Sequence, residues 1–187
     1  ELETHGVRFR SHSDTEVLLE AFARWGVQVL PRLVGMFAFA VLDTSARKVV
    51  LARDPFGIKP LHVAHGEGWF AFASEPKALL ELPQVSRGVD AQRVYDYLRF
   101  GLTDHGEGTL LAGIRTLQAA HWLEVSLDDA RPAPAVCYWQ LPCERRFEGS
   151  FDEAAARLRE LFVDSVRLHL RSDVPVGAYL SGGMDSS

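Results

Sequence analysis

The hydrophobic pattern along the first two thirds of the chain predicts short helices and strands. Some segments repeat apolar residues at helical spacing, and others are short runs rich in β-branched and aromatic residues. The predicted helices cover about 15–26, 75–80 and 91–98. The predicted strands cover 36–42, 49–52, 61–64, 69–73 and 121–127. Because the strands carry near-continuous small and aromatic residues, we expect a sheet covered on both faces in a layered α/β sandwich.

The last part of the chain has a different pattern. Ser150 and Glu153 have the spacing of a capping box, and the apolar stripe after them predicts a helix that ends near Arg171. The apolar run Val174–Leu180 predicts a buried parallel strand. It leads directly into the glycine-rich segment 181–183. Helix, buried strand and glycine loop in this order are typical of the opening of a nucleotide-binding α/β domain.

The composition narrows the range of functions. The 187 residues are 47% hydrophobic and 24% charged, which excludes a disordered or fibrous chain. A net charge of −5 without a basic run indicates no nucleic-acid or membrane partner, and the longest apolar stretch, 35–42, is too short to span a bilayer. Cys137 and Cys143 lack metal-ligand spacing and are expected to be small hydrophobic residues. We therefore expect a cytoplasmic protein that binds small molecules or proteins.

The glycine-rich segment is the strongest candidate for chemistry. Gly182 and Gly183 allow backbone N–H groups to approach an anion closely, and the hydroxyls of Ser181 and Ser186 can donate to phosphate oxygens. No lysine follows the glycines, so the segment differs from a Walker A loop. The alternative is a flexible tail rich in Gly and Ser. The apolar run ahead of the loop argues against that alternative.

Several motifs in a fixed order resemble one family. The sequence Ser-Gly-Gly-Met-Asp-Ser at 181–186 is similar to the pyrophosphate-binding SGGxDS loop of ATP pyrophosphatases. Segments upstream resemble the later half of an amino-terminal-nucleophile glutaminase domain and the connection after it: 13–16, 35–40, 52–61, 72–79, 113–117, 121–123 and 138–139. A glutaminase followed by this loop resembles the glutamine-hydrolysing asparagine synthetases. Glutamine phosphoribosyl amidotransferases share a segment like 52–61, but the loop at 181–186 argues against them.

The resemblance implies a fold class and an activity. The fold would be a partial αββα sandwich of the amino-terminal-nucleophile type, followed by the first helix, strand and loop of a parallel α/β ATP-pyrophosphatase domain. The implied domains are a partial glutaminase at 1–130, a connection at 131–149 and the start of an ATP-binding domain at 150–187. In this family an amino-terminal cysteine releases ammonia from glutamine, and aspartate is converted to asparagine through an aspartyl-adenylate, with release of AMP and pyrophosphate. The implied cofactors are ATP and Mg²⁺, the substrates are glutamine and aspartate, and a homodimer is compatible with the family.

The resemblance also assigns individual residues. Asp14 corresponds to the carboxylate that binds the α-amino group of glutamine, with Ser13 beside it. From the residues alone, Ser13 and Glu16 fit a capping box equally well, with Asp14 as a partner of the helix dipole. Asp185 is the implied Mg²⁺ ligand. The residues implied to bind ATP or pyrophosphate are Leu180, Ser181, Gly182, Gly183, Asp185 and Ser186.

Other polar residues in the matching segments have a structural interpretation. We expect Arg53 and Asp54 to support the sandwich, with a surface ion pair as the alternative. Glu75 is expected to be a first-turn carboxylate without a chemical task. His62 and His65 lie three residues apart on a predicted strand and would point to opposite faces. They are therefore not expected to form a metal site.

Parts of the family pattern are missing from these residues. There is no amino-terminal cysteine, and the arginine and Asn-Gly pair that bind the carboxylate and oxyanion of glutamine are also missing. No catalytic residue is therefore assigned, and we expect an inactive internal fragment of a longer enzyme. One alternative is a related ATP-dependent amidoligase, of the β-lactam synthetase or peptide-cyclising kind, that lacks the nucleophile. The other is a truncated, non-catalytic binding partner of a full-length homologue, although exposed sheet edges would favour aggregation of a lone fragment.

Overall fold

The structure is a computed structural model that describes residues 1–103, 105–144 and 146–184. The chain divides into two units, Glu1–Leu141 and Pro142–Ser187. Among the described residues, no helix is both long and apolar enough to cross a membrane.

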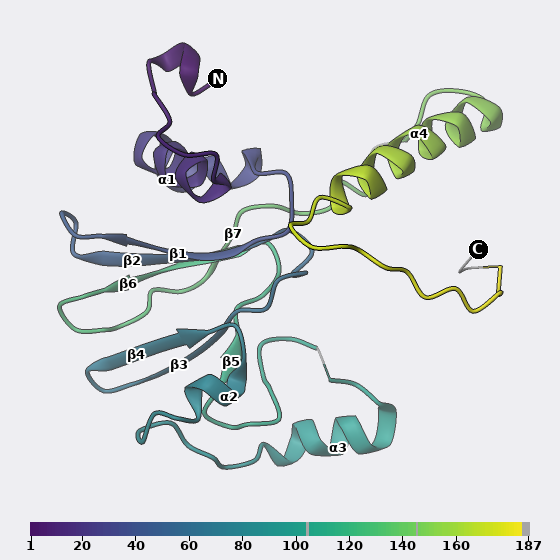
Figure 1. Cartoon of the computed structure of the whole chain (residues 1–187). Coiled ribbons are helices and arrows are strands. Elements are labelled where there is room, and N and C mark those ends of the chain that lie inside the picture. Colours follow the sequence, from purple (N-terminus) through teal and green to yellow (C-terminus); the bar gives the residue numbers. More distant parts are fainter. Residues whose placement is uncertain (104, 145, 185–187) are drawn as a thin grey trace. The chain divides into compact units, whose positions relative to one another are not determined.

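The first unit consists of two antiparallel sheets with helices packed on them (Figure 1). Its helices are η1 (Glu3–His5), α1 (Asp14–Trp25), η2 (Gly26–Arg32), α2 (Pro76–Leu79) and α3 (Ala91–Phe100). Its strands are β1 (Ala38–Asp43), β2 (Lys48–Arg53), β3 (His62–Gly66), β4 (Trp69–Ala73), β5 (Arg115–Thr116), β6 (His121–Ser126) and β7 (Val136–Cys137). The strand orders are β1-β2-β6-β7 and β4-β3-β5. The helices and strands predicted for this part of the chain are confirmed, with bounds that differ by a few residues.

Apolar side chains between the two sheets form the main core of the first unit. In the four-stranded sheet, Leu51 of β2 pairs with Leu123 of β6, and both side chains are buried. Val63 of β3, in the three-stranded sheet, and Leu61, which directly precedes β3, belong to the same cluster. Because successive side chains of a strand point to opposite faces, these positions place one face of each sheet against the other.

Helices cover the outer faces of the sheets. Phe22 of α1 packs edge-on against Phe39 of β1, with ring centroids 6.5 Å apart. On the other sheet, Leu79 of α2 is buried in a cluster with Ala64 of β3. The layers follow the order helix, sheet, sheet, helix, which confirms the predicted αββα sandwich (Figure 1).

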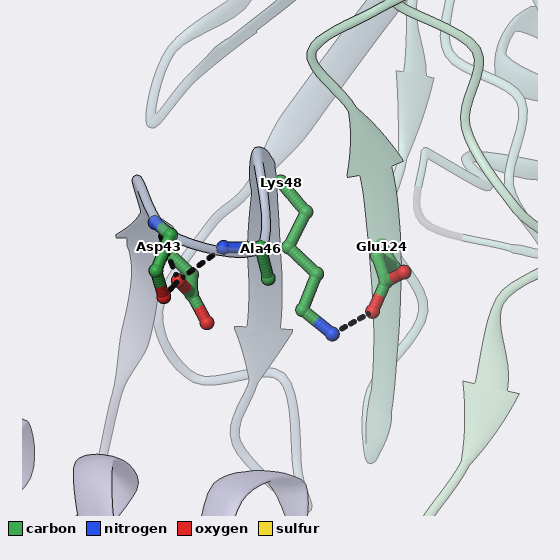
Figure 2. Close-up of polar contacts among 5 residues, drawn as sticks. Asp43, Ala46, Lys48 and Glu124 are labelled. Atoms are coloured by element: carbon green, nitrogen blue, oxygen red, sulfur yellow. Dashed lines mark hydrogen bonds and ion pairs between the residues drawn. The ribbon is translucent and has the colours of Figure 1, made fainter.

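Two polar contacts secure the register of three neighbouring strands. Asp43 accepts hydrogen bonds from the backbone N–H groups of Ser45 at 3.0 Å and Ala46 at 2.9 Å, which closes the turn from β1 to β2. The bond from the Ala46 N–H lowers the pKa of the Asp43 carboxyl most, and the bond from the Ser45 hydroxyl lowers it further. Lys48 Nζ lies 2.7 Å from the Glu124 carboxylate, and this ion pair joins β2 to β6 (Figure 2).

The second unit is built around one long helix, α4 (Phe151–His169). The Ser150 hydroxyl accepts a hydrogen bond from the Glu153 N–H, and the Glu153 carboxylate accepts one from the Ser150 N–H at 2.8 Å. This confirms the predicted capping box. The bond from the Ser150 N–H lowers the pKa of the Glu153 carboxyl most, and the bond from the Ser150 hydroxyl lowers it further. The apolar stripe of α4 is exposed within the described residues.

The strand predicted at Val174–Leu180 does not form in this chain. The segment pairs with no other described strand, and its residues are exposed. A parallel strand takes its hydrogen bonds from neighbouring strands, and the described residues of this unit provide none. The prediction of a buried strand is wrong here because an apolar run is buried only where a partner sheet receives it.

Candidate functional site

The predicted glutamine-binding residues lie where the chain enters α1. Ser13 precedes the helix, and its hydroxyl accepts a hydrogen bond from the Thr15 N–H at 3.2 Å. Asp14 is the first helical residue and is exposed. Its carboxylate has no hydrogen bond or ion pair to another side chain that the structure describes. An exposed carboxylate next to a hydroxyl is suited to bind an ammonium group.

Glu16 does not complete the predicted capping box with Ser13. Its carboxylate accepts hydrogen bonds from the N–H groups of Arg10 at 2.8 Å and Ser11 at 2.7 Å, and from the Ser11 hydroxyl at 2.5 Å. The bond from the Ser11 hydroxyl lowers the pKa of the Glu16 carboxyl most, and the bond from the Arg10 N–H lowers it further. The capping-box prediction is wrong for Glu16. Residue spacing identifies which positions share a helical turn, but not the path of the chain that precedes it.

Ser13 also lines an open pocket of about 620 Å³. Arg8, His12 and Glu3 bring ionisable groups to its wall, and Phe9 brings an aromatic ring. A wall with groups of both charges is suited to a small polar ligand. Sequence reasoning selected Ser13 in this pocket, but it did not select Arg8 or His12.

The predicted phosphate-binding loop lies in the second unit. Leu180 and the segment 181–183 are exposed, and Ser181 Oγ accepts a hydrogen bond from the Gly183 N–H at 3.4 Å. Gly182 has a φ of +75°, which residues with a side chain rarely adopt. A Cβ at Gly182 would have no neighbour within 4 Å, so glycine is needed for the backbone conformation and not for space. A turn of this kind can direct backbone N–H groups toward a phosphate.

Two predicted ATP-binding residues, Asp185 and Ser186, lie outside the described residues. The assignment of Asp185 to Mg²⁺ therefore stays a prediction. In the part of the chain that the structure describes, no group of three or more His, Cys, Asp and Glu side chains could hold a metal ion.

Asp54 is a buried carboxylate that organises the loop after β2. Its side chain has no exposed surface, and it accepts hydrogen bonds from the N–H groups of Phe56 at 3.1 Å, Ile58 at 3.0 Å and Lys59 at 2.9 Å. Three donors satisfy the buried charge, so the supporting role is confirmed and the surface ion pair is wrong for Asp54. The sequence Asp-Pro-Phe-Gly, typical of a turn, is the signal that could have predicted this loop.

Arg53 secures the same loop through its guanidinium group. The guanidinium donates hydrogen bonds to the carbonyl oxygens of Gly57, Lys59 and Leu117, each at 2.7 Å. Gly57 has a φ of +63°, and a Cβ there would lie 3.1 Å from Arg53 Cζ. The Tyr138 hydroxyl donates to the Arg53 carbonyl at 2.8 Å. Burial raises the pKa of the Tyr138 phenol most, and the nearby Asp54 carboxylate raises it further.

A larger pocket of about 890 Å³ opens beside Arg53. Gln118 contributes a polar group to its wall, and Phe56 and Leu110 contribute apolar ones. None of the described residues assigned to glutamine or to ATP lines this pocket. The structure thus places the predicted glutamine-binding residues and this pocket in different parts of the first unit.

Two of the remaining polar residues that the sequence singled out, Glu75 and His62, have structural partners. Glu75 and Lys77 form an exposed ion pair at 2.6 Å, and this contact raises the pKa of the Lys77 ammonium group. Glu75 directly precedes α2 and does not lie in its first turn, so the expectation of a first-turn carboxylate is wrong. On β3, His62 Nδ1 lies 3.0 Å from Thr116 Oγ1, whereas His65 is exposed.

Both cysteines are free and exposed. Cys137 Sγ donates to the Trp139 carbonyl at 3.1 Å. The expectation that Cys137 and Cys143 act as small hydrophobic residues is wrong, because both residues are exposed.

Two family models match the chain, one after the other. The model for the glutamine amidotransferase domain matches residues 1–139. The chain belongs to the glutamine amidotransferase domain family. A model for asparagine synthase matches residues 157–187. The amidotransferase segment contains Ser13 and Asp14, and the synthase segment contains the glycine loop.

Curated relatives of this amidotransferase chain match along nearly its whole length. A Mycobacterium tuberculosis protein, provisionally named as a glutamine-hydrolysing asparagine synthetase, is 41% identical over 197 residues, which is 100% of this chain and 29% of the relative. Asparagine synthetase (glutamine-hydrolysing) 3 of Bacillus subtilis is 37% identical over 187 residues, 100% of this chain and 30% of the relative. Amidase chry2 of Gibberella zeae is 29% identical over 183 residues, 96% of this chain and 26% of the relative. The chain spans less than a third of the length of these relatives.

Among solved structures, the chain is similar to the glutamine phosphoribosylpyrophosphate amidotransferase of Bacillus subtilis, solved with ADP and GMP. The TM-score is 0.46 at 22% identity, and the match covers 71% of this chain and 24% of the other. This likeness is too distant to carry an argument about function.

Proposed function

We propose that this chain is part of a cytoplasmic, glutamine-hydrolysing asparagine synthase. The parent enzyme would make asparagine from aspartate, glutamine and ATP, and would release AMP and pyrophosphate. The observation that carries the proposal is the succession of an amidotransferase segment at 1–139 and an asparagine synthase segment at 157–187. The names of the relatives from Bacillus subtilis and Mycobacterium tuberculosis support it.

In the glutaminase half, Ser13 and Asp14 would bind the α-amino group of glutamine. The exposed carboxylate of Asp14 lies at the start of α1, beside the Ser13 hydroxyl. A carboxylate without another partner among the described residues can form a charge-assisted hydrogen bond to the substrate's ammonium group. This contact would orient glutamine, while the residues that attack its carboxamide would come from the rest of the parent protein.

In the synthetase half, the turn at 180–183 would bind the phosphates of ATP. The positive φ of Gly182 supports this role, because it allows consecutive N–H groups to face one anion. Ser186 would donate its hydroxyl to the same phosphates. Asp185 would help hold Mg²⁺, which would neutralise phosphate charge during adenylation.

The deciding experiment is an assay of the full-length product of the parent gene. Its intact mass and amino-terminal residue would be determined first, followed by asparagine and pyrophosphate formation with glutamine or with ammonia as nitrogen donor. We expect a protein several times heavier than 20.8 kDa that begins with Cys and forms asparagine from glutamine. A Gly182→Ala variant should lose pyrophosphate release and retain glutamine hydrolysis, because alanine disfavours the turn's φ.

A second candidate is an ATP-dependent amidoligase with another acceptor. Amidase chry2 favours it, because that relative matches 96% of this chain and its name does not mention asparagine. The same assay separates the two candidates. Adenylation of a carboxylate other than aspartate, in a parent protein that begins with a residue other than Cys, would support the amidoligase. A native product of only 20.8 kDa would contradict both candidates.

A further inference from the structure

One carboxylate fixes the backbone that leads into Ser13 and Asp14. Glu16 Oε1 accepts the Arg10 N–H at 2.8 Å, and Oε2 accepts both the Ser11 N–H at 2.7 Å and the Ser11 hydroxyl at 2.5 Å. Two successive N–H groups converge on one carboxylate only where the chain bends, and the chain bends here. Glu16 thus acts on the segment before the helix, although it lies inside the helix.

Ser11 links the Glu16 carboxylate to the backbone of Ser13 in the candidate site. Its hydroxyl donates to Glu16 and accepts the Ser13 N–H at 3.2 Å. The Ser13 hydroxyl is in turn occupied by the Thr15 N–H. Since the Asp14 carboxylate has no bond of its own to another described side chain, the backbone that Glu16 and Ser11 hold determines where Asp14 lies.

We infer that Glu16 is a positioning residue for glutamine binding. Through Ser11, it holds the backbone of Ser13 and Asp14 in the conformation that receives the α-ammonium group of the substrate. The inference rests on the proposed function, since it assumes that Asp14 binds that group. Glu16 uses both carboxylate oxygens within the turn, so it acts through its neighbours and does not contact the substrate.

The position requires a carboxylate of this length. The Arg10 and Ser11 N–H groups bond to different oxygens of Glu16. In a glutamine side chain of the same conformation, the NH₂ group would replace one of these oxygens and would face one of these donors. An aspartate side chain is one carbon shorter and would not span the same distance from α1. Ser11→Ala would remove the hydroxyl bonds to Glu16 and to the Ser13 N–H, and would leave both backbone bonds to Glu16.

The test is steady-state kinetics of the full-length parent enzyme with Glu16→Gln, Ser11→Ala and Asp14→Asn. We expect Glu16→Gln to raise the KM for glutamine about tenfold, in line with the loss of a hydrogen bond to a charged group. The kcat for glutamine should change little, and ammonia-dependent synthesis should stay at the wild-type rate. Ser11→Ala should raise the KM less than Glu16→Gln does.

Glu20→Gln is the matched control. It makes the same chemical change one turn further along α1, at a residue whose carboxylate has no hydrogen bond or ion pair among the described residues. Its KM for glutamine should equal that of the wild type. Backbone amide exchange provides a second measurement, because the amides at 10–13 should exchange faster in Glu16→Gln than in Glu20→Gln.

The outcomes separate this inference from the proposed function. An active wild type in which Asp14→Asn raises the KM and Glu16→Gln does not would overturn the inference alone. A Glu16→Gln variant that loses ammonia-dependent synthesis as well would show a general structural role and would also overturn it. A wild-type parent that does not use glutamine would overturn the proposed function, and the inference with it.

Discussion

The Tyr138 hydroxyl donates a hydrogen bond to the backbone carbonyl of Arg53 at 2.8 Å, across a sequence separation of 85 residues. It thereby ties the end of the first unit to the end of β2. The Arg53 side chain extends the same connection, since its guanidinium bonds the Leu117 carbonyl. The stability of this region therefore depends on residues far apart in sequence.

Removing the Tyr138 hydroxyl should destabilise the first unit. We expect Tyr138→Phe to lower the free energy of unfolding by about 1 kcal/mol, the usual contribution of one such bond. Urea unfolding followed by tryptophan fluorescence would measure it, because all four tryptophans lie in the first unit. Tyr95→Phe, a change on α3 at an exposed ring, is the control and should leave the midpoint unchanged.

The same tyrosine should make stability depend on alkaline pH. Its pKa is raised in the folded protein above the ordinary value of 10.0. The folded state then holds the proton more tightly than the unfolded state, so the stabilisation is fully present below pH 10 and is lost as pH rises through the raised pKa. Unfolding curves between pH 9 and 11 should fall more steeply for the wild type than for Tyr138→Phe. Parallel curves would contradict the burial of this phenol.

Substitution of Asp54 should lower the free energy of unfolding more than Tyr138→Phe does. An asparagine has a single acceptor oxygen for three backbone N–H donors, so at least one buried donor would lose its partner. We expect Asp54→Asn to cost about 3 kcal/mol of unfolding free energy. Asp43→Asn is the matched control, because Asp43 also accepts backbone N–H groups but lies at an exposed turn. An equal effect of the two substitutions would mean that burial of Asp54 is unimportant.

The ion pair between Lys48 and Glu124 should contribute little. Both side chains are partly exposed, at 33% and 39%, and pairs of this kind contribute under about 1 kcal/mol. A double-mutant cycle with Lys48→Met and Glu124→Gln should give a small favourable coupling energy that decreases in 1 M salt. A coupling energy unaffected by salt would indicate that the pair is shielded from water.

The capping box of α4 can be tested in a synthetic peptide of residues 148–171. Ser150→Ala should destabilise the helix by about 1 kcal/mol, seen as reduced helical circular dichroism at pH 7. Ser165→Ala, within the helix, is the control and should preserve or increase the signal. Equal loss in both variants would argue against a capping effect.

The Glu153 carboxylate, the second member of the capping box, should make the helicity of this peptide depend on pH. The pKa of this carboxyl is lowered from its ordinary value of 4.5 in the helix. Its stabilisation is therefore present above pH 4.5 and is lost as pH falls through the lowered pKa. Helicity of the peptide should decrease between pH 5 and pH 2 more in the wild type than in Glu153→Gln.

The sequence predicted the sandwich well because its elements are encoded locally. The short apolar run at 49–52, rich in β-branched residues, identifies a strand, and the stripe at helical spacing over 15–26 identifies a helix; both are confirmed. The burial of Asp54 was harder to predict, because it depends on backbone donors that meet only after the loop has folded. The failure at Val174–Leu180 has a related cause, since burial of a strand is decided by its neighbours.

The sequence motifs predicted which residues belong to the candidate site, but not the hydrogen bonds that hold them. Ser13 and Asp14 were selected by resemblance, and the structure places both at the start of α1. The hydrogen bonds of Glu16 could not be predicted, because its spacing from Ser13 fits an ordinary capping box equally well. Only the path of the chain before the helix distinguishes the two arrangements.

The contacts around Arg53 and Asp54 also have a consequence for the order of folding. They join β2, the residues near Leu117 and Tyr138, and contacts between such distant segments form late because long loops must close first. During translation, this part of the first unit cannot reach its final form until Tyr138 has left the ribosome. By then synthesis has passed into the second unit, so the amidotransferase segment completes its folding while the synthase segment is already being made.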